Sequence, residues 1–255
     1  MVLSGWSDGP LHHVLQTPLA HGVTKLHATV VDIPMPPSGC LWLKNPYLLA
    51  IVGWLFGCTK LIPFFLNAVG FETKTSRLFG GVACTVAAVW ITWRIIKHLI
   101  DYAVSDGVAR ARKAINEIQP DLVIGFSWGG AVLYWLLEQP ATWEGGALLL
   151  APTVTKLASL SGRPIRGFAK TGAPNSGIDG SVATAGMGTK TQNIIIIQGN
   201  DDPFCEPAQL TWFESQAKEL EGMQVVGVED NHVLMQHHTL QLAREAVARL
   251  LVANS

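Results

Sequence analysis

The segment between residues 121 and 139 constrains the fold of this chain more than any other part of it. Leu122 to Ile124 is a short apolar run, which is typical of a strand buried on both faces. The glycine-rich turn Gly125 to Gly130 follows directly, and the helical pattern after it stops before Pro140. A buried strand that passes through a sharp turn into a helix is a building unit of parallel sheets, so this segment predicts an α/β fold.

The turn itself has the sequence Gly125-Phe-Ser127-Trp-Gly129, which matches a nucleophile elbow. Such an elbow strains the serine backbone, and side chains two residues before and after it would collide with the strand and the helix. Gly125 and Gly129 remove those side chains. The Ser127 hydroxyl would then stand at the carboxyl end of the sheet, near the positive end of the helix dipole. The alternative is an ordinary turn in which Ser127 caps the helix.

Strand and helix patterns alternate along the rest of the chain, which predicts a doubly wound, mostly parallel sheet of about six strands. The length of 255 residues suits one domain, or one domain with an insertion. Residues 161–190 are rich in glycine and predict a long loop. The expected strands lie within residues 1–3, 25–33, 122–124, 146–150, 193–198 and 223–228, and the expected helices within 11–20, 105–118, 132–137, 206–220 and 234–252.

Two apolar blocks interrupt this alternation. Tyr47 to Phe71 contains a single charged residue, Lys60, and Leu78 to Trp93 contains none. A membrane-spanning helix needs about 20 mostly apolar residues. With the polar segment Glu72 to Arg77 as the turn between them, the two blocks predict a transmembrane helical hairpin. The alternative is a hydrophobic cap packed over the core of a soluble enzyme.

The predicted hairpin divides the chain into three parts: residues 1–40 begin the sheet domain, 41–104 form the inserted hairpin, and 105–255 complete the domain. Lys44, Arg94 and Lys97 lie on the domain side of the hairpin. The positive-inside rule therefore places the globular part on the cytoplasmic or organellar-matrix side of a membrane. The formal net charge of −1 gives no reason to expect a nucleic-acid partner.

Two polar turns follow later strands. Gly199 to Pro203 comes after a run of four isoleucines and contains Asp201 and Asp202, and His232 follows the last strand. With Ser127, this order of serine, acid and histidine resembles the α/β-hydrolase family. The resemblance covers residues 106–252 well and 1–37 loosely. It is closest to small esterase-like members that lack the first two strands of the family's sheet.

The resemblance implies a role for each of these residues. Ser127 would attack a carbonyl carbon, His232 would remove and return the proton, and Asp202 would orient the imidazole. The family's acid commonly lies in a Gly-x-x-Asp turn before a proline, which favours Asp202 over Asp201. In the alternative reading, Asp202 only forms a turn and His232 only caps a helix.

The oxyanion hole would consist of two backbone N–H groups. One is that of Trp128, directly after the nucleophile. The other would be that of Trp6, in the loop after the first strand, where many family members have His-Gly. Here Ser4 and Gly5 precede Trp6, which leaves the alignment of this loop open.

These observations predict a membrane-anchored serine hydrolase that cleaves a carboxylic ester or thioester, with lipid-derived esters among the candidate substrates. No cofactor is expected. The four cysteines are far apart and lack a Cys-x-x-Cys pair, so neither a metal site nor a disulfide scaffold is expected. The alternative is a catalytically idle fold retained as a subunit of a larger membrane complex, since a fold alone does not establish activity.

Overall fold

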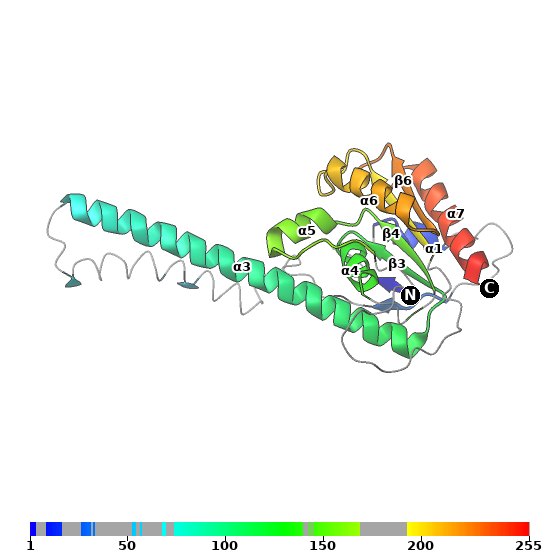
Figure 1. The fold of residues 1–255 in the computed structure, drawn as a ribbon, viewed down its shortest axis with the longest axis horizontal. Coiled ribbons are helices and arrows are strands. Elements are labelled where there is room, and N and C mark those ends of the chain that lie inside the picture. Colours follow the sequence, from blue (N-terminus) through cyan, green and yellow to red (C-terminus); the bar gives the residue numbers. More distant parts are fainter. Residues whose placement is uncertain are drawn as a thin grey trace. The chain divides into compact units, whose positions relative to one another are not determined.

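The structure is a computed structural model of the chain (Figure 1). Two compact units are distinguished in it. One comprises Met1–Pro34, Val104–Ser159 and Arg163–Ser255, and the other comprises Met35–Ala103 and Leu160–Gly162. The structure describes residues 1–3, 9–16, 27–31, 33, 53–54, 57, 68–69, 74–139, 143, 145–168 and 193–254, with the side chains of 74–81, 83–85 and 254 left out.

A six-stranded sheet forms the centre of the first unit, with every neighbouring pair of strands parallel. The strand order is β2-β1-β3-β4-β5-β6, which confirms the predicted parallel sheet. Because all strands run the same way, their carboxyl ends meet at one edge of the sheet. The strands are β1 (Val2–Leu3), β2 (Val30–Val31), β3 (Leu122–Phe126), β4 (Gly146–Leu150), β5 (Ile194–Gly199) and β6 (Met223–Val228).

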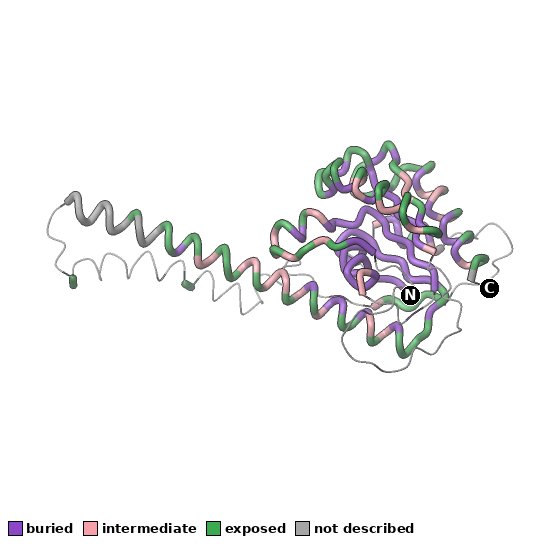
Figure 2. The backbone as a smooth tube through the Cα atoms, viewed as in Figure 1, coloured by how far each residue is buried: buried purple, intermediate pink, exposed green. Residues whose placement is uncertain are grey.

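Helices α1 (Leu11–Gln16) and α7 (His237–Asn254) pack on one face of this sheet. Successive side chains of a strand point to opposite faces, and the core on this side takes alternate residues of β3, β4 and β5. All residues of these three strands are buried (Figure 2), which is why their sequences are continuous apolar runs and not alternating ones. The core cluster includes Val2, Leu11, Val14, Leu122, Ile124, Phe126, Leu148, Leu150, Ile195, Ile197 and Val247.

The other face carries α4 (Trp128–Leu137) and α6 (Pro207–Glu219). Every residue of α4 is buried, and its Tyr134 ring packs edge-on against Phe213 of α6. A short helix, α5 (Val154–Ser161), follows β4 and was not expected from the sequence. It is only eight residues long and includes two β-branched residues and two serines, so it would be marginal as an isolated helix, and the burial of Val154, Leu157 and Ala158 stabilises it.

Helix α3 (Lys74–Ile118) is continuous over 45 residues. The sequence predicts a turn up to Arg77 and a separate helix starting at Ser105, and both boundaries are wrong. The segment contains no proline to stop a helix. An ion pair of 2.8 Å between Arg110 and Asp106, one turn apart, lies just beyond the expected break.

No helix in the described part of the chain is both long enough and apolar enough to cross a membrane. The first apolar block, residues 47–71, lies almost entirely outside the described residues, as does most of the expected loop at 161–190. The second block is part of α3. The transmembrane hairpin and the three-part division of the chain therefore stay predictions.

Candidate active site

Ser127 connects β3 to α4. Its backbone angles, φ 53° and ψ −114°, are ones that residues other than glycine rarely adopt. Hydrogen bonds fix this backbone: the Ser127 N–H donates to the Leu150 carbonyl at 2.9 Å, and the Ser127 carbonyl accepts from the Ala131 N–H at 3.0 Å. Strain held in place by its surroundings is typical of functional sites. The Ser127 hydroxyl makes no capping bond to the helix, which excludes the reading of Ser127 as a side-chain cap.

The tight turn depends on Gly125. A Cβ atom at this position would lie 2.6 Å from the Gly129 carbonyl oxygen and 2.9 Å from the Gly130 Cα atom. Both neighbours are backbone and cannot rotate away, so the collision expected at Gly125 is present. Gly130, which the sequence did not single out, makes a second close approach: its Cβ atom would lie 3.1 Å from the Gly125 oxygen and from Pro152.

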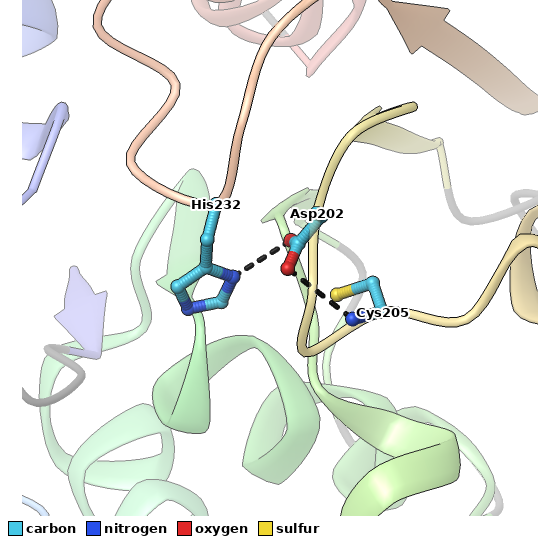
Figure 3. Close-up of side chains that lie close together, drawn as sticks. All are labelled: Asp202, Cys205 and His232. Atoms are coloured by element: carbon cyan, nitrogen blue, oxygen red, sulfur yellow. Dashed lines mark hydrogen bonds and ion pairs between the residues drawn. The ribbon is translucent and has the colours of Figure 1, made fainter.

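Three side chains meet at the carboxyl edge of the sheet. The Ser127 Oγ atom lies 2.7 Å from Nε2 of His232, and Nδ1 of His232 lies 2.7 Å from Oδ2 of Asp202. Figure 3 shows the His232 ring directed at the Asp202 carboxylate. Ser127 follows β3, His232 follows β6 and Asp202 follows β5. Because these strands are parallel, the turns that carry the three side chains lie at the same edge of the sheet. Asp201, the alternative acid, is exposed and contacts the Asp230 carbonyl through its own N–H at 3.2 Å.

The Asp202 carboxylate is held charged in a buried position. Its side chain has no exposed area, and its Oδ1 atom accepts the N–H groups of Phe204 at 2.7 Å and Cys205 at 3.2 Å. Burial alone would raise the pKa of Asp202, but the hydrogen bonds from His232, Cys205 and Phe204 outweigh it, and the pKa is lowered from its ordinary 3.8.

The charged carboxylate determines which nitrogen of His232 carries the proton. An ionised carboxylate can only accept, so the Nδ1–H of His232 donates to Asp202. The Nε2 atom of the neutral imidazole is then a free acceptor, and the Ser127 O–H donates to it. This is the protonation state in which a histidine can remove a proton from serine.

Two aromatic rings restrict the His232 imidazole. The Phe126 ring centroid lies 5.5 Å away and the Phe204 centroid 4.8 Å away. Phe126 is buried, whereas Phe204 is 47% exposed. The ring is thus held in the rotamer that faces both Ser127 and Asp202, with only 16% of the His232 side chain exposed.

The turn that carries His232 has its own internal bonds, centred on Asp230. The Asp230 carboxylate accepts the N–H groups of Asn231 at 2.8 Å and Gln236 at 3.0 Å. This turn also lies directly against the acid turn, because a Cβ atom on Gly199 would be 2.3 Å from the Asp230 carbonyl oxygen. Gly199 therefore allows the two turns to approach closely enough for His232 to reach Asp202.

A buried glutamine, which sequence reasoning missed, connects the elements around the site. Gln209 of α6 donates to the Pro152 carbonyl at 2.6 Å and to Gln198 at 2.8 Å, and accepts the Thr155 N–H at 2.8 Å. It has no exposed area. The Cys205 thiol donates to the same Pro152 carbonyl at 3.4 Å. A glutamine in a helical pattern gives no sign of such a role.

Asp202, Cys205 and His232 (Figure 3) place possible metal ligands within 4.8 Å of one another. Metal binding requires a thiolate and a free ring nitrogen. Burial and the neighbouring Asp202 charge raise the pKa of the Cys205 thiol, so this sulfur stays protonated. Nδ1 of His232 is already bonded to Asp202. These three side chains therefore fit a proton relay better than a metal centre.

The Trp128 N–H is the first of α4, and the first amides of a helix have no acceptor within it. It lies next to the Ser127 hydroxyl in sequence and is available to an oxyanion. Trp6, the second expected donor, falls within residues 4–8, outside the described part of the chain. Its contribution stays a prediction.

A parallel sheet thus presents a serine in a strained strand-to-helix turn, followed along the chain by an acid and a histidine at later strand ends. The fold is of the α/β-hydrolase type. Within this sheet Ser127 follows β3, Asp202 follows β5 and His232 follows β6, in the order expected from the sequence.

Comparison with known proteins gives distant similarity to solved structures of esterases. No family model and no curated protein matches the chain. A Pyrococcus furiosus esterase matches at 14% identity and TM-score 0.39, over 60% of this chain and 62% of that one. A Bacillus cereus carboxylesterase matches at 17% identity and TM-score 0.38, over 59% of this chain and 61% of that one. The chain thus spans slightly less than two thirds of either structure. Likeness at these TM-scores does not assign an activity.

Proposed function

We propose that this protein is a serine hydrolase that cleaves carboxylic esters or thioesters through an acyl-enzyme. One observation carries the proposal: an unbroken hydrogen-bonded relay from Ser127 through His232 to Asp202, with both contacts at 2.7 Å. Within such a relay, each group has the protonation state that nucleophilic catalysis requires.

In the first half-reaction, His232 Nε2 takes the proton from Ser127 as its Oγ bonds to the carbonyl carbon. The carbonyl π electrons move to oxygen, and the Trp128 N–H donates to the resulting oxyanion. The negative Asp202 stabilises the imidazolium that forms. When the oxyanion collapses, the bond to the leaving alcohol or thiol breaks, and His232 returns the proton to it. Acylated Ser127 remains.

In the second half-reaction, water takes the place of the departed alcohol or thiol. His232 removes a proton from the water as its oxygen attacks the acyl carbon. Collapse of the second tetrahedral intermediate breaks the bond to Ser127 Oγ, which regains its proton from His232. The carboxylic acid leaves, and the relay returns to its starting protonation state.

The proposal is tested by labelling the full chain with a fluorophosphonate, which phosphonylates activated serines. We expect stoichiometric labelling at Ser127, none in Ser127→Ala, and normal labelling in Ser215→Ala, because Ser215 is an exposed serine of α6 whose hydroxyl donates to the Trp212 carbonyl. A folded wild-type protein that stays unlabelled would reject the proposal. The idle-subunit alternative would then require stoichiometric co-purification with a membrane complex.

A Ser-His-Asp relay acts on the acyl carbon, so it leaves the rest of the substrate undefined. We further propose that the two apolar blocks anchor the protein to a membrane and that its substrate is derived from a lipid. Retention of the full chain in membranes after carbonate washing tests the anchoring. Release into the supernatant would favour the alternative of a soluble enzyme with a hydrophobic cap.

A further inference from the structure

Helix α3 carries large apolar side chains on the outside of the second unit. The exposed fractions are 56% for Val82, 63% for Val86, 60% for Val89, 60% for Trp90 and 44% for Trp93. We call these five residues the α3 stripe. An exposed, continuous apolar surface of this kind commonly marks a site of interaction with a protein or a membrane.

The spacing of the α3 stripe places it on one side of the helix. Successive residues of the stripe are one, three or four positions apart. In a helix with 3.6 residues per turn, these positions cover roughly 100° of the helix circumference. Ala88, on the other side, is buried. A helix on a water-exposed surface has charged residues outward; here the outward side is apolar.

Two cations lie against the tryptophans of the α3 stripe. The guanidinium carbon of Arg94 is 5.3 Å from the centre of the Trp90 ring, and the Lys97 ammonium is 5.6 Å from that of Trp93. The sequence from residue 82 to 97 contains no acidic side chain. The apolar surface therefore ends in a positively charged rim that has no negative charge of its own in this segment.

From this arrangement we infer that the α3 stripe binds an anionic lipid surface. The three valines contact acyl chains, and the tryptophans lie at the boundary with the headgroups, where their amphipathic rings are favoured. The charged ends of Arg94 and Lys97 lie over the tryptophan rings, and at the headgroup level they pair with the lipid phosphates. This inference rests on the proposed membrane anchoring, to which it adds the contacting residues and the lipid charge, and it does not depend on the hydrolase activity.

The rim charges favour lipid over a protein partner. A protein partner would have to place acidic side chains opposite both cations, whereas an anionic leaflet attracts juxtamembrane lysines and arginines along its whole surface. A bilayer has an apolar interior next to a layer of phosphate groups. The valines, tryptophans and cations follow one another along α3 in the same order as these layers. A polybasic segment near an anionic leaflet gains about 1 kcal/mol per cation, which is about fivefold in binding.

The test uses the full chain, synthesised in the presence of phosphatidylcholine vesicles with or without phosphatidylserine. A photoreactive benzoylphenylalanine replaces Val89, or Tyr102 as the matched control. Tyr102 is 64% exposed on the same helix, but on the other side. We expect cross-links to lipid from position 89, at least about tenfold stronger than from position 102, and stronger with phosphatidylserine.

The variant Arg94→Gln/Lys97→Gln should lower the gain from phosphatidylserine by tenfold or more, while Lys113→Gln, an exposed cation further along α3, should leave it unchanged. Cross-links from position 89 to a second copy or another protein, or no preference over position 102, would overturn lipid binding. Equal yields on both vesicles in the wild type would overturn the role of the two cations.

Discussion

The Ser127 hydroxyl lies 2.7 Å from Nε2 of His232, although 105 residues separate them in sequence. The two turns that carry them follow β3 and β6, which are not neighbours in the sheet. Their meeting depends on every strand between them running parallel and in register. Changes that alter these turns should therefore affect activity and folding in distinct ways.

Asp202→Asn should lower kcat by roughly 10⁴-fold, because an amide can no longer hold His232 in the tautomer that accepts a proton from Ser127. Asp201→Asn is the matched control. Asp201 is exposed and has no contact with the imidazole, so its variant should stay within about threefold of wild type. Ester hydrolysis by the purified variants measures both. Equal losses would contradict the assignment of Asp202 as the acid.

Stability should decrease at acidic pH through Asp202. The pKa of this carboxyl is lowered in the folded protein, so its contribution is complete above the unfolded value near 3.8 and is lost as pH falls through the lower folded value. Thermal unfolding of wild type and Asp202→Asn between pH 6 and pH 2 should show a difference in Tm that narrows below about pH 3.8. A difference in Tm that stays constant between pH 6 and pH 2 would mean that the charge of the Asp202 carboxylate contributes nothing to stability.

Gly125→Ala should destabilise the protein by about 2–4 kcal/mol, since its methyl group would lie 2.6 Å from the Gly129 carbonyl oxygen. Gly227→Ala serves as the control: its methyl would approach only the tips of the Asn200 and Leu210 side chains, which can move. Urea unfolding gives both values. If the soluble Gly125→Ala protein kept both wild-type stability and fluorophosphonate labelling, the tight-turn explanation would be wrong.

Gln209→Leu should cost about 2–4 kcal/mol of stability, because it removes the hydrogen bonds of Gln209 to the Pro152 carbonyl, the Thr155 N–H and the buried Gln198 side chain. We also expect kcat to fall with KM little changed, since Pro152 contacts Cys205 beside the acid. Gln241→Leu, at an exposed site on α7, should change neither quantity. A Gln209→Leu protein as stable as wild type would show that this network is dispensable.

Local sequence patterns predicted most of the sheet and the candidate site. The apolar runs of β3, β4 and β5 are continuous because both faces of each strand are buried, and the turn glycines mark where backbone segments crowd together. Asp202 could be preferred to Asp201 only by resemblance, whereas the structure separates them by burial: one carboxylate has no exposed area and the other is exposed.

The sequence by itself determined the order of strands and helices, the sharp turn at Ser127 and the polar turns after later strands, because these depend on burial periodicity and on local steric constraints. Only the tertiary structure decided that α3 is one uninterrupted helix, that α5 exists, and that Gln209 connects α6 to β5 and to the loop after β4. Helix α3 continues because no proline stops it. The other two depend on contacts between residues distant in sequence, and the energy of such contacts can exceed the weak preference of a short segment for its own conformation.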